Sequence, residues 1–117
     1  MPIQNWSENI VLAELQNDPV CTDDLNALSE QLTANKDADV VVDFSNVNYL
    51  NSSNIAKLLK LRKLVVISNH RRMVLCAINS HVWGVFLITG LERLFEFADT
   101  VALGLAGIQI ENGPAEE

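Results

Sequence analysis

The residue types that could take part in chemistry are concentrated in one segment, in which two adjacent serines are flanked by asparagines. The segment is Asn51-Ser52-Ser53-Asn54. We expect a helix to begin here, and the free backbone N–H groups and the dipole of a helix N-terminus favour negative charge. A serine hydroxyl in this place could therefore carry a phosphoryl group or lie beside a bound anion, and Lys57, one turn later, would stabilise that charge. The alternative is that Asn51 or Ser52 only caps the helix.

The sequence offers little else for catalysis or for metal binding. It has no glycine-rich phosphate loop, no pair of histidines at ligand spacing, and no serine, histidine and acid in a recognisable nucleophile elbow. His70 and His81 have no Cys or carboxylate at metal-ligand spacing, so we expect both to be ordinary surface residues. We therefore expect no enzyme activity, no metal and no cofactor. A small enzyme or ligand carrier is the least favoured hypothesis, because it needs a pocket with convergent polar groups that no motif here indicates.

The composition indicates one globular domain. The chain has 117 residues, of which 49% are hydrophobic and 20% charged, which is enough for a single core. Its apolar stretches are far shorter than the roughly 20 residues that cross a bilayer, and residues 1–15 carry no cationic leader, so we expect a cytoplasmic protein that does not insert into membranes. A net charge of −7 argues against nucleic acid as a partner. Cys21 and Cys76 lie in apolar segments and are expected to be buried, reduced thiols.

Apolar segments and turn residues alternate in the order of an α/β fold. Strands are predicted at residues 9–15, 39–44, 73–78 and 94–97, and an extra strand at 3–6 would make five. Helices are predicted over 22–34, 55–68, 82–89 and 101–106, with Thr22, Ser80 and either Asp99 or Thr100 as N-caps, and Gly90 and Gly107 ending the last two. Residues 40–42 are three consecutive valines, which is typical of a strand covered on both faces in a parallel sheet. We therefore predict an α/β domain over residues 1–110, with a mixed, mostly parallel sheet of four to five strands and about four helices, before an acidic flexible tail at 111–117.

Positive charge is concentrated in residues 57–72, which contain no acid. On the predicted helix over 55–68, an inward apolar stripe is expected at Ile55, Leu58, Leu59, Val65 and Val66. Lys57, Lys60, Leu61 and Leu64 then fall outside this stripe and form a mixed basic and apolar face. Such a face could dock an acidic protein partner. The alternative is a solvated face on which the leucines are shielded by the neighbouring helix or by lysine stems.

The segment from the apolar strand at 39–44 to the motif at 51–54 resembles the STAS domain of bacterial anti-sigma-factor antagonists. In that family an apolar strand leads to an Asp-Ser-Ser-Gly motif that opens a helix, and here the motif falls on Asn51-Ser52-Ser53-Asn54. The resemblance continues through residues 73–78, 79–80, 82–91 and 94–97 and into the last helix, so that it spans about 10–108. It implies a single STAS-like domain, in agreement with the element order inferred above.

The resemblance also implies a function. In the family, the second serine of the motif is phosphorylated by an anti-sigma kinase, the unphosphorylated antagonist binds that kinase and frees the sigma factor, and a phosphatase resets the switch. By resemblance, Ser53 is the phosphoacceptor of this chain, and its partners are an anti-sigma-factor serine kinase and a phosphatase. The residues expected to bind a partner are Asn51, Ser52, Asn54, Lys57, Lys60 and Leu61. The antagonist itself needs no catalytic residue, because the kinase supplies the chemistry.

Two positions depart from the family motif. Asn51 stands where the family has Asp, and Asn54 stands where it has Gly. These departures favour a second hypothesis, in which the chain is a STAS scaffold without phosphorylation or a soluble subunit of a signalling assembly or membrane transporter. The oligomeric state is not determined by the sequence.

Overall fold

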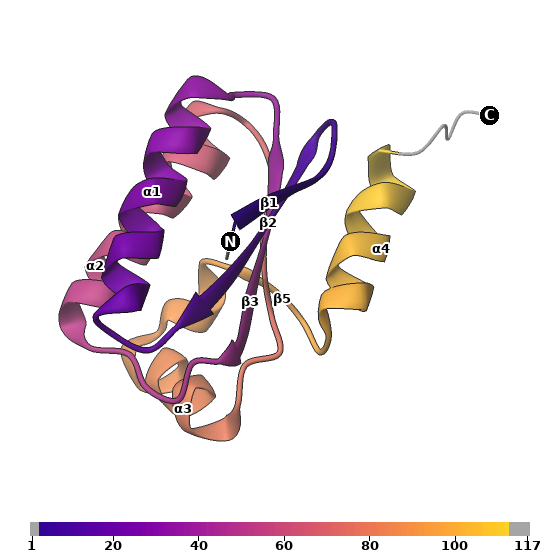
Figure 1. Cartoon of the computed structure of the whole chain (residues 1–117). Helices are drawn as coiled ribbons and strands as arrows, with labels where there is room; N and C mark the ends of the chain where they lie inside the picture. Colours follow the sequence, from indigo (N-terminus) through magenta and orange to yellow (C-terminus); the bar gives the residue numbers. More distant parts are fainter. Residues whose placement is uncertain (1–2, 113–117) are drawn as a thin grey trace.

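A five-stranded sheet forms the centre of the computed structural model, which describes residues 3–112 and their side chains as far as residue 110 (Figure 1). The strand order is β1-β2-β3-β4-β5. The strands are β1 (Ile3–Ser7), β2 (Ile10–Gln16), β3 (Asp39–Asn46), β4 (Met73–Cys76) and β5 (Glu96–Ala98). β1 is antiparallel to β2, and the other neighbours are parallel. The predicted α/β fold and its mixed, mostly parallel sheet are confirmed.

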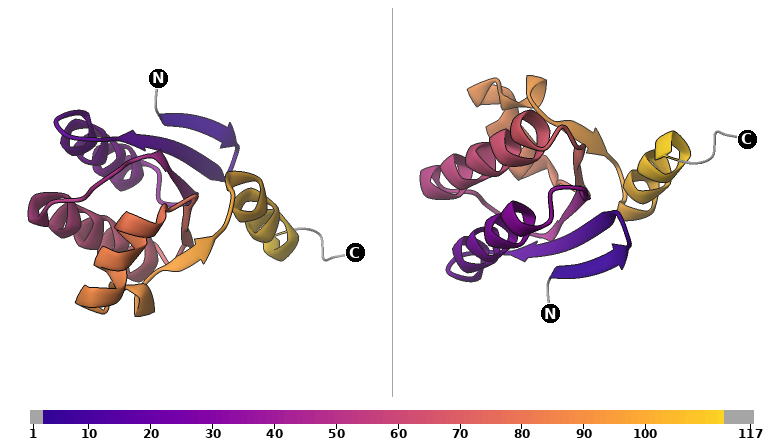
Figure 2. Two further views of the ribbon diagram at one scale, coloured as in Figure 1. Left: turned by 90° about the horizontal axis from the view of Figure 1, so that it is seen from below. Right: turned by 90° about the horizontal axis from the view of Figure 1, so that it is seen from above.

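Helices cover both faces of this sheet. They are α1 (Val20–Ala34), α2 (Ser52–Arg62), the π-helical turn η1 (Lys63–Ser68), α3 (Ser80–Thr89), the short 3-10 turn η2 (Leu91–Arg93) and α4 (Val101–Asn112). α1, α2 and α3 lie on one face, and α4 lies alone on the other (Figure 2). No helix in the part of the chain that the structure describes is long and apolar enough to span a membrane.

The three consecutive valines of β3 pack into two different hydrophobic cores. Val40 and Val42 point into the larger core under α1, α2 and α3, whereas Val41 points into the smaller core under α4. All three valines are fully buried, because side chains alternate across a strand and both faces of this one are covered. In the smaller core, α4 approaches the sheet so closely at Gly104 that a β-carbon there would lie 2.5 Å from Sγ of Cys76.

Several predicted boundaries need correction. α1 begins at Val20 rather than at 22, so Thr22 lies inside its first turn and does not cap it. The cap of α3 is Asn79, whose side chain accepts from the backbone N–H of Val82, and not Ser80. Thr100 caps α4 as expected, because its hydroxyl accepts from Leu103 N at 3.1 Å.

The two glycines that are predicted to end helices behave differently. Gly90 ends α3 in the left-handed conformation, with φ 77°, as predicted. Gly107 does not end α4, which continues to Asn112. Ile108 is fully buried against the sheet, and this packing stabilises the helix beyond Gly107. The predicted tail at 111–117 therefore overlaps the end of α4, and residues 113–117 lie outside the described part of the chain.

Candidate functional site

The segment at 51–54 folds into a reciprocal cap at the start of α2. The side-chain oxygen of Asn51 accepts from the backbone N–H of Asn54 at 2.8 Å. The side-chain oxygen of Asn54 in turn accepts from the backbone N–H of Asn51 at 3.2 Å. This is a capping box, in which two backbone donors of the first helical turn find partners. The predicted capping role of Asn51 is confirmed.

Asp18, in the turn between β2 and α1, holds this cap in place. Its carboxylate accepts from Nδ2 of Asn51 at 2.6 Å and from Nδ2 of Asn54 at 3.1 Å. The same carboxylate accepts from the hydroxyl of Thr22 at 2.7 Å and from its backbone N–H at 3.0 Å. One side chain thus joins the starts of α1 and α2. Hydrogen bonds from Thr22, Asn54 and Asn51 stabilise the charged form and lower the pKa of Asp18 from 3.8 to about 2.

Asp18 is not one of the residues that the sequence predicts for this site. The sequence signal for Asp18 is its place just before a predicted helix, four positions before Thr22, where an acidic side chain can accept from the first backbone N–H groups. Its pairing with α2 bridges 33 residues of sequence and could not be inferred from local spacing.

Two further amides fix the loop that connects β3 to α2. The side-chain oxygen of Asn17 accepts from the backbone N–H of Asn48 at 2.8 Å. Nδ2 of Asn79, at the start of α3, donates to the carbonyl oxygen of Val47 at 3.0 Å. The loop that leads into α2 is therefore attached both to the turn before α1 and to the turn before α3. All three segments lie at the C-terminal ends of the parallel strands.

Ser52 and Ser53 are exposed on this well-supported turn. Within residues 3–110, neither hydroxyl makes a hydrogen bond. The cap is instead made by Asn51 and Asn54, which leaves both serine hydroxyls available to solvent or to another protein. Asn54 itself is only 1% exposed, so its side chain supports the turn from inside.

The outer face predicted for α2 is partly wrong. Leu61 is completely buried with Leu58 and Val65, whereas Leu59, which was expected to point inward, is only half-buried. The buried stripe of the helix begins at Asn54 and then follows the spacing of 58, 61 and 65, which is rotated from the predicted stripe. Leu61 therefore cannot contribute to a mixed basic and apolar docking face.

The two lysines of that face do reach the surface. Lys60 is exposed, and Lys57 is half-buried. Nζ of Lys57 donates to the side-chain oxygen of Asn26 on α1 at 3.2 Å. Lys57 thus connects the two helices one turn below Ser53.

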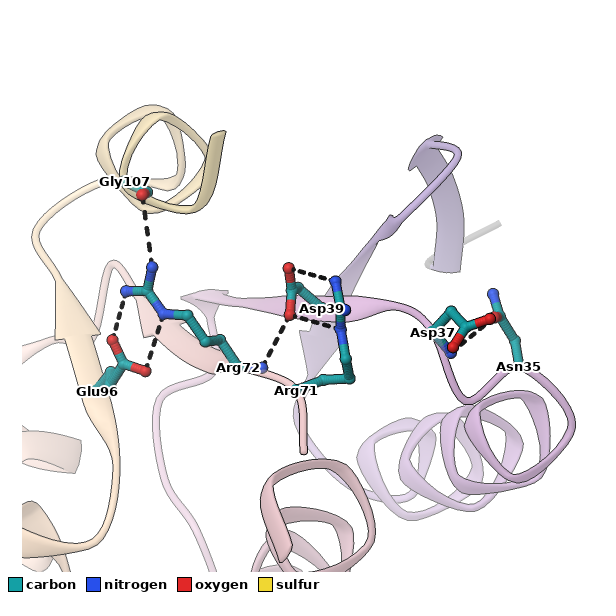
Figure 3. Close-up of polar contacts among 7 residues, drawn as sticks. All are labelled: Asn35, Asp37, Asp39, Arg71, Arg72, Glu96 and Gly107. Carbon is teal, nitrogen blue, oxygen red and sulfur yellow. Dashed lines mark hydrogen bonds and ion pairs between the residues drawn. The ribbon is translucent and has the colours of Figure 1, made fainter. Parts of the chain in front are cut away.

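Three arginines of the basic stretch are engaged in structural contacts, and Figure 3 shows those of Arg71 and Arg72. Arg71 donates to both carboxylate oxygens of the buried Asp39, at 3.1 and 3.0 Å. Arg72 forms an ion pair with Glu96 of β5 and lies beside the carbonyl oxygen of Gly107 on α4. Nε of Arg62 donates to Leu94 O at 2.6 Å. These cations connect strands and helices of the fold, so the basic stretch is not one free docking surface.

The remaining titratable candidates have the expected environments. Cys21 and Cys76 are buried, free thiols, and burial raises the pKa of each to about 11. His70 and His81 are exposed. Among the residues placed by the structure, no group of three His, Cys, Asp or Glu side chains could hold a metal ion.

Comparisons with known proteins bear on this arrangement. A family model of the STAS domain matches residues 16–104. A search of curated protein sequences gave no match. The structure of TM1081 from Thermotoga maritima superposes with a TM-score of 0.79 at 15% identity, covering 92% of this chain and 93% of that one.

Two further solved structures have the same fold. An anti-sigma-factor antagonist (STAS) domain protein from Planctomyces limnophilus has a TM-score of 0.74 at 14% identity, over 91% of this chain and 96% of its own. The Bacillus cell fate determinant SpoIIAA in its phosphorylated form has a TM-score of 0.63 at 13% identity, over 83% and 89%. Since the family model covers more than half of the sequence and the sheet and helices agree with these structures, the chain belongs to the STAS domain family.

Proposed function

We propose that this protein is an anti-sigma-factor antagonist that binds an anti-sigma serine kinase in the cytoplasm and is released when Ser53 is phosphorylated. The observation that carries the proposal is the exposed hydroxyl of Ser53 in the first turn of α2, on a turn whose cap is made by other side chains. The similar fold of SpoIIAA, which has been solved in a phosphorylated form, supports it.

The structure suggests how a phosphoryl group would act at this position. It would add about −1.5 to −2 charges to an exposed turn. The N-terminus of α2 would tolerate that charge locally, since its dipole and backbone donors favour anions. A partner that covers the turn would have to bury the new charge, and this cost would weaken the complex. Asn51, Ser52, Lys57 and Lys60 would surround the contact. A phosphatase would restore binding.

Asp18 adds a feature that the motif alone lacks. The family's Asp is replaced by Asn51, but the carboxylate of Asp18 lies 2.6 Å from the amide of Asn51. A negative charge is therefore present beside the motif, supplied by another loop. A kinase that recognises an acidic group next to its target serine would find one here.

The test is binding to an anti-sigma serine kinase from the same organism, measured by calorimetry, together with mass spectrometry after incubation with the kinase and ATP. We expect one phosphoryl group on Ser53, tight binding that persists for Ser53→Ala, and weakened binding for Ser53→Asp. Ser52→Ala is the matched control and should still be phosphorylated. Unchanged binding of Ser53→Asp, or phosphorylation elsewhere, would contradict the proposal.

A second function, a STAS scaffold without phosphorylation, is favoured by one observation. Both departures from the motif, Asn51 and Asn54, are used in a structural network with Asp18. Such a domain could bind partners in a signalling assembly or with a transporter without any change at Ser53. Protein purified from its native cells would then carry no phosphoryl group on the peptide containing Ser52 and Ser53, with or without stress.

A further inference from the structure

A cavity of about 390 Å³ opens beside the C-terminal ends of β4 and β5. Its wall is formed chiefly by the apolar side chains of Leu75, Ile78, Trp83 and Phe97, and its polar residues are Ser80 and Asp99. The volume falls within the range of about 300 to 1,000 Å³ that is usual for small-molecule sites. The cavity lies outside the carboxyl ends of two neighbouring parallel strands.

The apolar wall is held rigidly by aromatic contacts. The rings of Trp83 and Phe97 meet edge to face, with centroids 4.9 Å apart and planes at 87°. Phe97 also meets Phe86 of the main core edge to face, at 5.5 Å. Leu75 is fully buried in β4. Because these rings are anchored to the core, the pocket is a preformed feature of the fold.

Three polar groups of the lining remain unused by the fold. In the described range of 3–110, no hydrogen bond is made by the hydroxyl of Ser80, the indole N–H of Trp83 or the carboxylate of Asp99. Ser80 and Asp99 are exposed, and Trp83 is half-buried. The pocket therefore combines an aromatic wall with one carboxylate and two further hydrogen-bonding groups.

We propose that this pocket binds a small primary amine with an aromatic or aliphatic body. The ammonium group would pair with Asp99, the charged side chain of the lining. The body would pack against Trp83 and Phe97, whose π faces also attract cations. The net charge of −7 favours the approach of a cation over that of an anion.

This site is distinct from the serine turn. It is built from β4, α3, β5 and the residue that follows β5, and it requires no phosphorylation of Ser53. Asn79 connects the two regions, because it caps α3 beside Ser80 and donates to Val47 in the loop before α2. Amine binding can therefore be tested separately from kinase binding, and failure of one leaves the other unaffected.

The experiment uses the intrinsic fluorescence of Trp83. Trp6, the other tryptophan, is replaced by Trp6→Phe in every protein, so that Trp83 is the reporter. Phenethylamine and hexylamine are titrated, and phenethyl alcohol and hydrocinnamate serve as neutral and anionic analogues. We expect saturable changes with an amine, weaker binding of the alcohol and none of the anion.

Two variants separate the pocket from general charge effects. Asp99→Asn should weaken amine binding by about tenfold, the size expected for loss of one charge-assisted hydrogen bond. Asp37→Asn removes the same charge from the exposed turn between α1 and β3. This turn lies at the N-terminal end of β3, away from the pocket at the C-terminal ends of β4 and β5, so the variant should leave binding unchanged. The proposal is overturned if neither amine gives a saturable change at millimolar concentration, if Asp99→Asn binds as tightly as the parent, or if hydrocinnamate binds more tightly than phenethylamine.

Discussion

Asp18 and Asn51 are joined by a 2.6 Å hydrogen bond between a carboxylate and a side-chain amide, across 33 residues of sequence. The bond connects the turn before α1 to the first residue of the serine motif. Because Asn51 also caps α2, the position of Ser53 depends on a residue in a different loop.

The first prediction concerns pH. The pKa of Asp18 is lowered from 3.8 to about 2 in the folded chain, chiefly by the hydrogen bond from Thr22. A lowered pKa stabilises the fold above pH 3.8, and this contribution is lost as the pH falls towards 2. In urea unfolding at a series of pH values, Asp18→Asn should be less stable than the parent above pH 3.8, and the difference should shrink below it. Asp37→Asn is the control, because it removes one carboxylate from an exposed turn and leaves the hydrogen bonds of Asp18 in place.

The second prediction restores the acid of the family motif. In Asn51→Asp, two carboxylates would meet where a 2.6 Å hydrogen bond now lies, and repulsion should destabilise the start of α2. The double variant Asp18→Asn with Asn51→Asp again pairs one amide with one carboxylate and should recover part of the lost stability. A double-mutant cycle of unfolding free energies measures this coupling. Purely additive effects would show that the two side chains do not interact.

The third prediction concerns the contact between α4 and the sheet. The added methyl group of Gly104→Ala would lie 2.5 Å from Sγ of Cys76, and such overpacking costs about 1 to 3 kcal/mol of unfolding free energy. Cys76→Ala in the same chain should relieve the clash, leaving the double variant more stable than additivity predicts. Gly107→Ala is the matched control on the same helix, since nothing lies within 4 Å of its added carbon.

The fourth prediction tests the corrected orientation of α2. Leu61→Ala removes a fully buried side chain and should lower the unfolding free energy by about 2 to 5 kcal/mol. Lys60→Ala changes the adjacent exposed position and should alter it by less than about 0.5 kcal/mol. Equal effects in chemical denaturation would mean that the helix is rotated relative to the sheet.

Local sequence patterns were sufficient for the order of the five strands and the four α-helices, but not for the turns η1 and η2. The three valines of β3 lack alternation because both faces of the strand are covered, and that pattern predicted a parallel sheet between helices. Gly90 ended a helix as predicted because its left-handed conformation is a backbone property of glycine. The resemblance of residues 51–54 to a STAS motif identified the turn whose serines are exposed.

Tertiary packing decided what local patterns left open. Leu61 faces the core instead of the surface, because the direction of the buried stripe depends on where α2 lies against the sheet. Gly107 remains helical because Ile108 is anchored in the core beneath α4. Asp18 reaches Asn51 and Asn54 only because parallel strands bring their C-terminal ends to one edge. Spacing along a chain determines which residues share an element, whereas contacts between elements depend on the sum of many weak packing interactions throughout the fold.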